Sequence, residues 1–187
     1  MSERLSYDLN PEMIDILARE FDARAIVDKF TEGLKAGRQA GELGKEIFGA
    51  HGEAWAKRTL ELGEKYTDQT YENLKLAAKR VKQLVFPHVP QRFIEIGYLA
   101  TQPFEALAVE QNNHYAFIFT VPECATYTAL KEKCGEEVAA QLPCREACLA
   151  FNKTIYKVLN MAAGLEMTAT LPVDGFCRFV AVNQNAG

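Results

Sequence analysis

The chain has 187 residues and a net charge of −4, and 48% of its residues are hydrophobic against 25% that are charged. This balance is typical of a globular protein with one sizeable core. The negative net charge argues against nucleic-acid binding, which would require a basic surface. The N-terminal stretch MSERLSYDLNPEM lacks the apolar segment of a secretory signal, and no apolar run reaches the roughly 18 residues of a membrane span. We therefore expect a cytoplasmic protein of one domain, residues 1–187, that binds neither nucleic acid nor a membrane.

The first part of this domain, residues 10–85, is predicted to be helical. Asn10 and Pro11 form a typical helix start, because Asn caps a helix and Pro fits its first turn. Six glycines then occur between Gly33 and Gly52. Each weakens a helix by up to about 1 kcal/mol, but the apolar residues still recur at helical spacing. One more helix is expected over residues 68–84, before two prolines interrupt the helical pattern.

The second part, residues 91–182, begins with a period of two. Strands are expected in RFIEIGYLA, FEALAVE and HYAFIFTV, followed by two helices that begin near Pro122 and Pro143. Two more strands flank the turn at Asp174-Gly175. This order predicts an α+β fold, in which a helical N-terminal half precedes a mostly antiparallel sheet of about five strands with two inserted helices.

The cysteines are the side chains best suited to chemistry. In a cytoplasmic protein they are expected to be reduced, which leaves core residues, metal ligands and reactive thiols as alternatives. Cys124 and Cys144 follow Pro122 and Pro143 closely, which places both in the first turn of a helix. Unpaired N–H groups at that position favour a thiolate and lower the pKa of a cysteine.

Metal binding is a second interpretation of the thiols. Cys148 shares a helix face with Cys144, and Cys177 lies on the last predicted strand. Together with Cys124 these residues could hold zinc or iron, although the chain lacks the close C-x2-C pairs of most structural zinc sites. Cys134 stands among Lys and Glu residues, and no role is expected for it.

Three other side chains complete the candidate site. His51 is the candidate general base, because imidazole titrates near neutral pH. Arg92 and Arg145 are candidate anchors for a substrate carboxylate. The chain has no Gly-rich phosphate loop, no HExxH and no GxSxG motif, which argues against the common nucleotide-dependent and serine-hydrolase classes.

Four segments carry a resemblance to a known family. They are FGAHGEAWAKRTLELGEKY, VPECATYTALKEKCG, LPCREACLAFNKTIYKVL and DGFCRFV. Together they resemble the L-2-amino-thiazoline-4-carboxylic acid hydrolase family over about residues 35–182. The closing motif of that family has Gly-Asp where this chain has Asp174-Gly175, and either Cys144 or Cys148 matches its middle cysteine.

The resemblance implies hydrolysis of a carbon–nitrogen bond in a small cyclic amidine-like carboxylic acid. A thiolate, Cys124 or Cys144, would attack the carbon while His51 handles protons, or a metal held by the cysteines would activate water. Two alternatives stay open. The thiols could form a ligand- or metal-binding module without turnover, or fill the core of a structural protein. The oligomeric state is also open, a homodimer included.

Overall fold

The computed structural model describes residues 11–65, 80, 107–113 and 115–185 of the chain. Its N-terminal helices are α1 (Pro11–Glu20), α2 (Ala23–Lys35), α3 (Ala40–Leu43), the π-helical turn η1 (Gly44–Phe48) and α4 (Gly49–Lys65). The second half contains β1 (Ala108–Asn112), β2 (Ala116–Val121), α7 (Ala125–Cys134), α8 (Glu136–Ala140), α9 (Arg145–Val158), β3 (Ala163–Ala169), α10 (Leu171–Asp174) and β4 (Cys177–Asn183).

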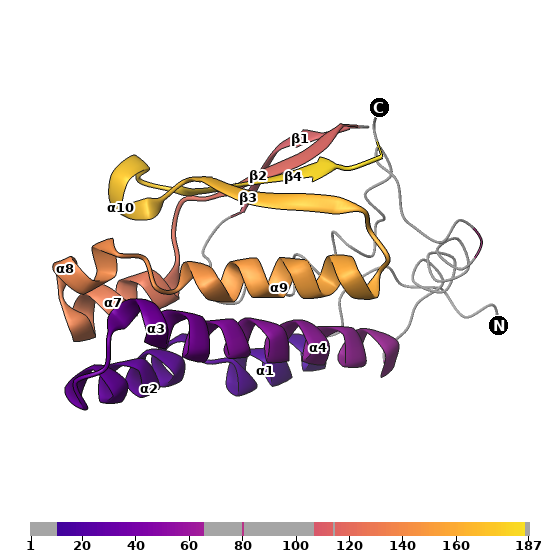
Figure 1. Ribbon diagram of the computed structural model, residues 1–187. Helices are drawn as coiled ribbons and strands as arrows, with labels where there is room; N and C mark the ends of the chain where they lie inside the picture. The colour runs from indigo at the N-terminus through magenta and orange to yellow at the C-terminus, as the bar shows by residue number, and fades with distance from the viewer. Residues whose placement is uncertain (1–10, 66–79, 81–106, 114, 186–187) are drawn as a thin grey trace.

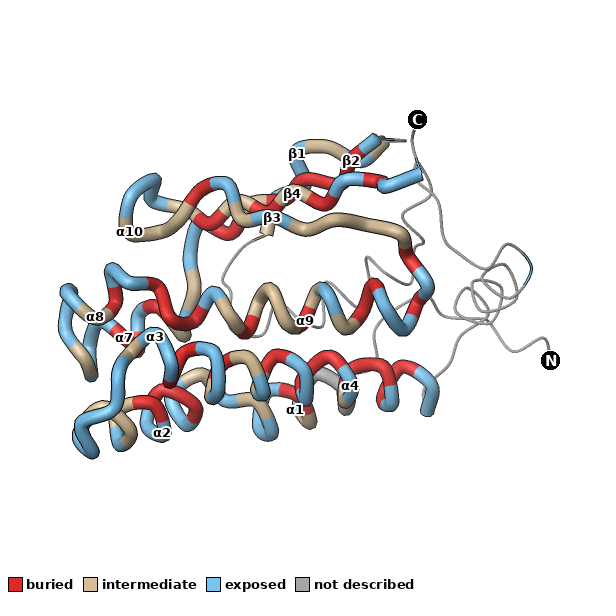
Figure 2. Tube along the Cα trace, in the orientation of Figure 1, coloured by how far each residue is buried: buried red, intermediate tan, exposed pale blue. Residues whose placement is uncertain are grey.

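These elements confirm the predicted α+β class. The described strands form one antiparallel sheet in the order β1-β2-β4-β3. Helix α9 lies between this sheet and the N-terminal helices, with α4 on its far side (Figure 1). Buried positions line the facing sides of α4 and α9 and the strands above them (Figure 2). The core therefore lies on both sides of α9.

Most of the predicted elements in the described residues are present. Helix α1 contains Pro11, and α7 is followed by its C-cap Gly135, whose φ of 83° suits a glycine. The expected turn before β4 is instead one helical turn, α10, closed by Gly175 in the left-handed conformation. The helix expected over residues 68–84 is described only at Arg80, which is helical, and the strand RFIEIGYLA lies outside the described residues. The described sheet has four strands rather than about five.

Strand β4 lies between β2 and β3 in the sheet and carries Cys177 and Phe179. Its buried residues alternate, as a strand with one core face requires. Cys177 pairs with Val121 of β2, and Phe179 pairs with Phe119 of β2 and with Met167 of β3. These cross-strand pairs share the face that looks toward α9.

A close approach at Gly52 holds α4 against α9. A Cβ atom built on Gly52 would lie 2.1 Å from the carbonyl oxygen of Ala147, a distance that an unbonded carbon and oxygen do not tolerate. One turn further on, Trp55 of α4 packs on Phe151 of α9 with ring centroids 4.7 Å apart. The glycine that weakens the helix by its propensity is thus the residue that lets the two backbones meet.

The π-helical turn η1 makes a second contact with the start of α9. Gly44, its first residue, is buried, and an added Cβ would lie 3.1 Å from the Cβ of Pro143. Pro143 immediately precedes Cys144. Two buried glycines of the N-terminal half therefore locate the segment that carries Cys144 and Cys148.

No helix in the described part of the chain is both long enough and apolar enough to cross a membrane.

Replacing Gly52 by alanine should lower the free energy of unfolding by about 1–3 kcal/mol, because the methyl group overpacks the α4–α9 contact. Gly49→Ala is the matched control, since it lies three residues away with no atom within 4 Å of the added Cβ, and it should stabilise the protein by about 0.5–1 kcal/mol. Urea denaturation of both variants measures the difference. Equal stability of the two variants would contradict the close approach.

Candidate functional site

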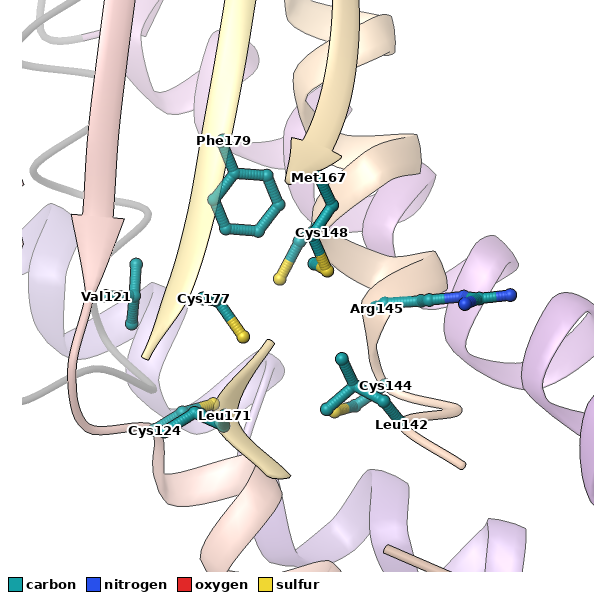
Figure 3. A pocket seen from close by; sticks show the side chains of 10 residues that line it. All are labelled: Val121, Cys124, Leu142, Cys144, Arg145, Cys148, Met167, Leu171, Cys177 and Phe179. Atoms are coloured by element: carbon teal, nitrogen blue, oxygen red, sulfur yellow. The ribbon is translucent and has the colours of Figure 1, made fainter. Parts of the chain in front are cut away.

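Four of the five cysteines line one small cavity between α9 and the sheet. The cavity measures about 20 Å³, which is enough for one water molecule or one ion, since a water needs about 10–15 Å³. Among the residues that the structure describes, the lining is Val121, Cys124, Leu142, Cys144, Arg145, Cys148, Met167, Leu171, Cys177 and Phe179 (Figure 3). The remaining cysteine, Cys134, lies elsewhere, with its sulfur 3.2 Å from the hydroxyl oxygen of Thr31.

Three different parts of the chain bring these thiols together. Cys124 stands at the N-cap of α7, directly after β2, and Cys144 stands at the N-cap of α9. The sequence-based placement of both cysteines at helix starts is therefore confirmed. Cys148 follows one turn along α9, and Cys177 opens β4. All five cysteines of the chain are free thiols.

A strained residue turns the chain into α9 beside the cavity. Leu142 has a φ of 52°, a left-handed conformation that branched side chains rarely adopt. Its side chain is 3% exposed and covers one side of the cavity. The amide of Arg145 donates to the carbonyl oxygen of Leu142 at 3.1 Å. Burial of the leucine thus holds a costly turn that directs Cys144 toward the other thiols.

Burial keeps the cavity thiols protonated near neutral pH. It raises the pKa of Cys144 and Cys148 well above the usual value, and it raises the pKa of Cys177 to about 11. A charge on any one of the four sulfurs would raise the pKa of another, and this holds for every pair among them. Such mutual repulsion identifies the four thiols as close electrostatic neighbours.

The expectation of a low-pKa thiolate at the helix starts is wrong. Burial raises the pKa of Cys124, and the N–H groups of Tyr127 and Thr126 oppose that shift without reversing it. The helix terminus therefore acts as the sequence predicted, but loss of water around the sulfur outweighs it. At Cys144 the shift is larger, and the surrounding thiols reinforce it.

His51 does not meet the cysteines. It lies on α4, where its ring packs edge-on against Phe21 at 5.3 Å and near Trp55 at 6.2 Å between centroids. Burial, with a smaller effect of the Lys29 charge, lowers the pKa of His51 to about 4. The imidazole is therefore neutral at pH 7 and part of an aromatic cluster, away from the cavity lining.

Of the two candidate carboxylate anchors, Arg145 does not face the cavity, and Arg92 stays a prediction. Arg145 borders the cavity, but its guanidinium group points away from it (Figure 3), and Nε lies 3.2 Å from a carboxylate oxygen of Glu146. Half of the Arg145 side chain is exposed. Arg92 lies outside the described residues.

Met167 is the site residue that sequence reasoning missed. Its thioether lies among the cavity-lining groups (Figure 3). The sequence signal was the alternation of β3, which places Met167 opposite Phe179 on the face of Cys177. A register shift between Met167 and Ala169 follows directly. Bulges of this kind redirect side chains and occur often beside functional sites.

The thiols surround the cavity but do not yet form a coordination sphere. Within the described ranges, no three His, Cys, Asp or Glu side chains are close enough together to hold a metal ion. Any ion would require the sulfurs to move inward by side-chain rotation.

The chain matches no protein-family model, no curated protein and no solved structure at a significant level. The resemblance to the thiazoline-carboxylate hydrolases stays a prediction from short motifs.

In protein free of metal, iodoacetamide should alkylate Cys144, Cys148 and Cys177 at pH 7 at least about tenfold more slowly than a free thiol with a pKa near 8.5. The reason is that only the thiolate reacts, and burial disfavours it. Mass spectrometry of each labelled residue, repeated as the pH rises, measures the effect. Faster reaction of Cys124 or Cys144 than of an ordinary thiol at pH 6 would restore the thiolate hypothesis.

Proposed function

We propose that the chain binds one thiophilic metal ion in the cavity lined by Cys124, Cys144, Cys148 and Cys177. The observation that carries this proposal is the presence of four thiols around one cavity of about 20 Å³. Thiolate sulfur is the donor that zinc and other soft metal ions prefer in proteins. Free cysteine also fills protein cores as a small apolar residue, and these four belong to the core or pack against it, but packing alone does not require that four of the five thiols line the same space.

Access and enclosure both suit a small ion. Cys124 and Cys148 are half-buried, whereas Cys144 and Cys177 are buried, so two of the four cysteines are partly accessible to solvent. Apolar side chains fill the rest of the wall, among them Leu171 and Phe179. Such a wall excludes competing water and strengthens the bond between sulfur and metal.

Hydrolysis of a cyclic amidine-like acid stays a prediction, and the described residues favour it less. The cavity has room for a water molecule rather than for a substrate ring. Neither His51 nor the guanidinium of Arg145 faces the thiols. His88, His114 and Arg92 lie outside the described residues.

Titration of the reduced protein with cadmium(II), followed by sulfur-to-metal charge-transfer absorption, tests the proposal. One equivalent should saturate the protein, and serine in place of any one of the four cavity cysteines should weaken binding by about tenfold or more. Cys134→Ser is the matched control, because that thiol contacts Thr31 rather than the cavity, and it should leave the affinity unchanged.

Binding should also stabilise the fold. At a free cadmium concentration 100 times the Kd, the free energy of unfolding should rise by up to about 2.7 kcal/mol. Absence of stoichiometric binding, or an equal effect of Cys134→Ser, would overturn the proposal. Turnover of 2-aminothiazoline-4-carboxylate that Cys124→Ser abolishes, in protein that binds no metal, would establish the hydrolase instead.

A further inference from the structure

The cavity contains a fifth sulfur atom besides the four thiols. Met167 enters from β3 and lines the same cavity as Cys148 (Figure 3). The remaining lining is hydrocarbon except for Arg145, whose guanidinium group points outward. No side-chain nitrogen or oxygen atom of the described lining is therefore available as a ligand.

We propose that the ion taken by this cavity is copper(I), with the thioether of Met167 as one of its ligands. This inference rests on the proposed metal-binding function and names the ion. Zinc in proteins is held by Cys, His, Asp and Glu. Soft thiolate and thioether donors favour copper(I), zinc and iron–sulfur clusters, and of these zinc and the clusters are bound through Cys rather than Met.

The net charge of the occupied cavity also favours copper(I). Every ionised thiolate adds a negative charge to a space walled by Val121, Leu142, Leu171 and Phe179, and an uncompensated buried charge is costly. A dication held by four thiolates leaves a net charge of −2. Copper(I) held by two thiolates leaves −1, releases two protons from the thiols, and gains its third ligand from a neutral thioether.

No positively charged side chain in the described part of the lining compensates the net charge of −2 of a tetrathiolate site. The Arg145 side chain is half exposed and paired with the Glu146 carboxylate. Its positive charge is therefore screened by solvent and already compensated. A low-charge complex of two thiolates and one thioether fits this surrounding better than a tetrathiolate.

The position of Met167 is fixed by the sheet rather than by chance packing. It pairs with Phe179 in register, and the register shift that follows lets Ala169 pair with Arg178, the residue preceding Phe179. The shift ends regular pairing directly after Met167 and before the turn into α10. Met167 is also only partly buried, which leaves its thioether free to turn toward an entering ion.

Affinities of Met167→Leu for two ions, measured without oxygen, test the inference. Copper(I) is titrated by competition with a chromophoric chelator, and cadmium(II) by charge-transfer absorption. Met167→Leu keeps the volume and polarity of the wall. It should weaken copper(I) binding by about tenfold or more and leave cadmium(II) binding unchanged.

Met161→Leu is the control, because Met161 is buried in the core at 9% exposure and does not line the cavity. It should alter neither affinity. Loss of both affinities in Met167→Leu would assign Met167 a packing role, and an unchanged copper(I) affinity would remove it as a ligand. Either result overturns this inference while metal binding by the thiols stands. Failure of the wild-type protein to bind either ion would overturn the proposed function as well.

Discussion

The contact between α4 and α9 at Gly52 is the constraint on which the rest of the structure depends. It brings the backbone of α4 onto the carbonyl of Ala147 with no space for a side chain. Ala147 lies between Cys144 and Cys148 in the same turn of α9, so a helix located by this contact carries two thiols at fixed positions. The sheet on the other side of α9 supplies Cys177, and the chain leaving β2 supplies Cys124. A displacement of α4 would therefore separate the two pairs of thiols.

Burial also decides the chemistry of the thiols. A helix start stabilises a thiolate, but loss of water destabilises it. The second effect is larger when the sulfur is surrounded by leucine, valine and other thiols. The cavity at neutral pH is thus a set of protonated thiols rather than a nucleophile with its base. Binding of a soft cation changes this balance, because the cation replaces protons and cancels the repulsion between the sulfurs. A neutral, apolar pocket rich in sulfur suits the capture of an ion better than attack on a substrate.

Local signals in the sequence were sufficient for the framework of the site. The two prolines placed Cys124 and Cys144 at helix starts, the four-residue spacing placed Cys148 beside Cys144, and the last predicted strand carried Cys177. The remaining features depend on contacts between distant segments. Neither the fit of Gly52 against Ala147 nor the isolation of His51 among Phe21 and Trp55 can be read from spacing. The direction of the thiol pKa shifts can be assigned only when the burial of each sulfur is known. The place of Met167 in the cavity can be assigned only from the register of β3 on β4.

The most direct measurement of the central claim is the X-ray absorption fine structure of the protein loaded with one equivalent of cadmium(II). The account predicts a first shell made of sulfur alone, because the described lining of the cavity offers no other donor. It also predicts that Cys177→Ser lowers the number of sulfur scatterers while Cys134→Ser leaves the spectrum unchanged. A first shell of nitrogen or oxygen atoms, or a spectrum that changes with Cys134→Ser, would contradict the convergence of the four thiols on one ion.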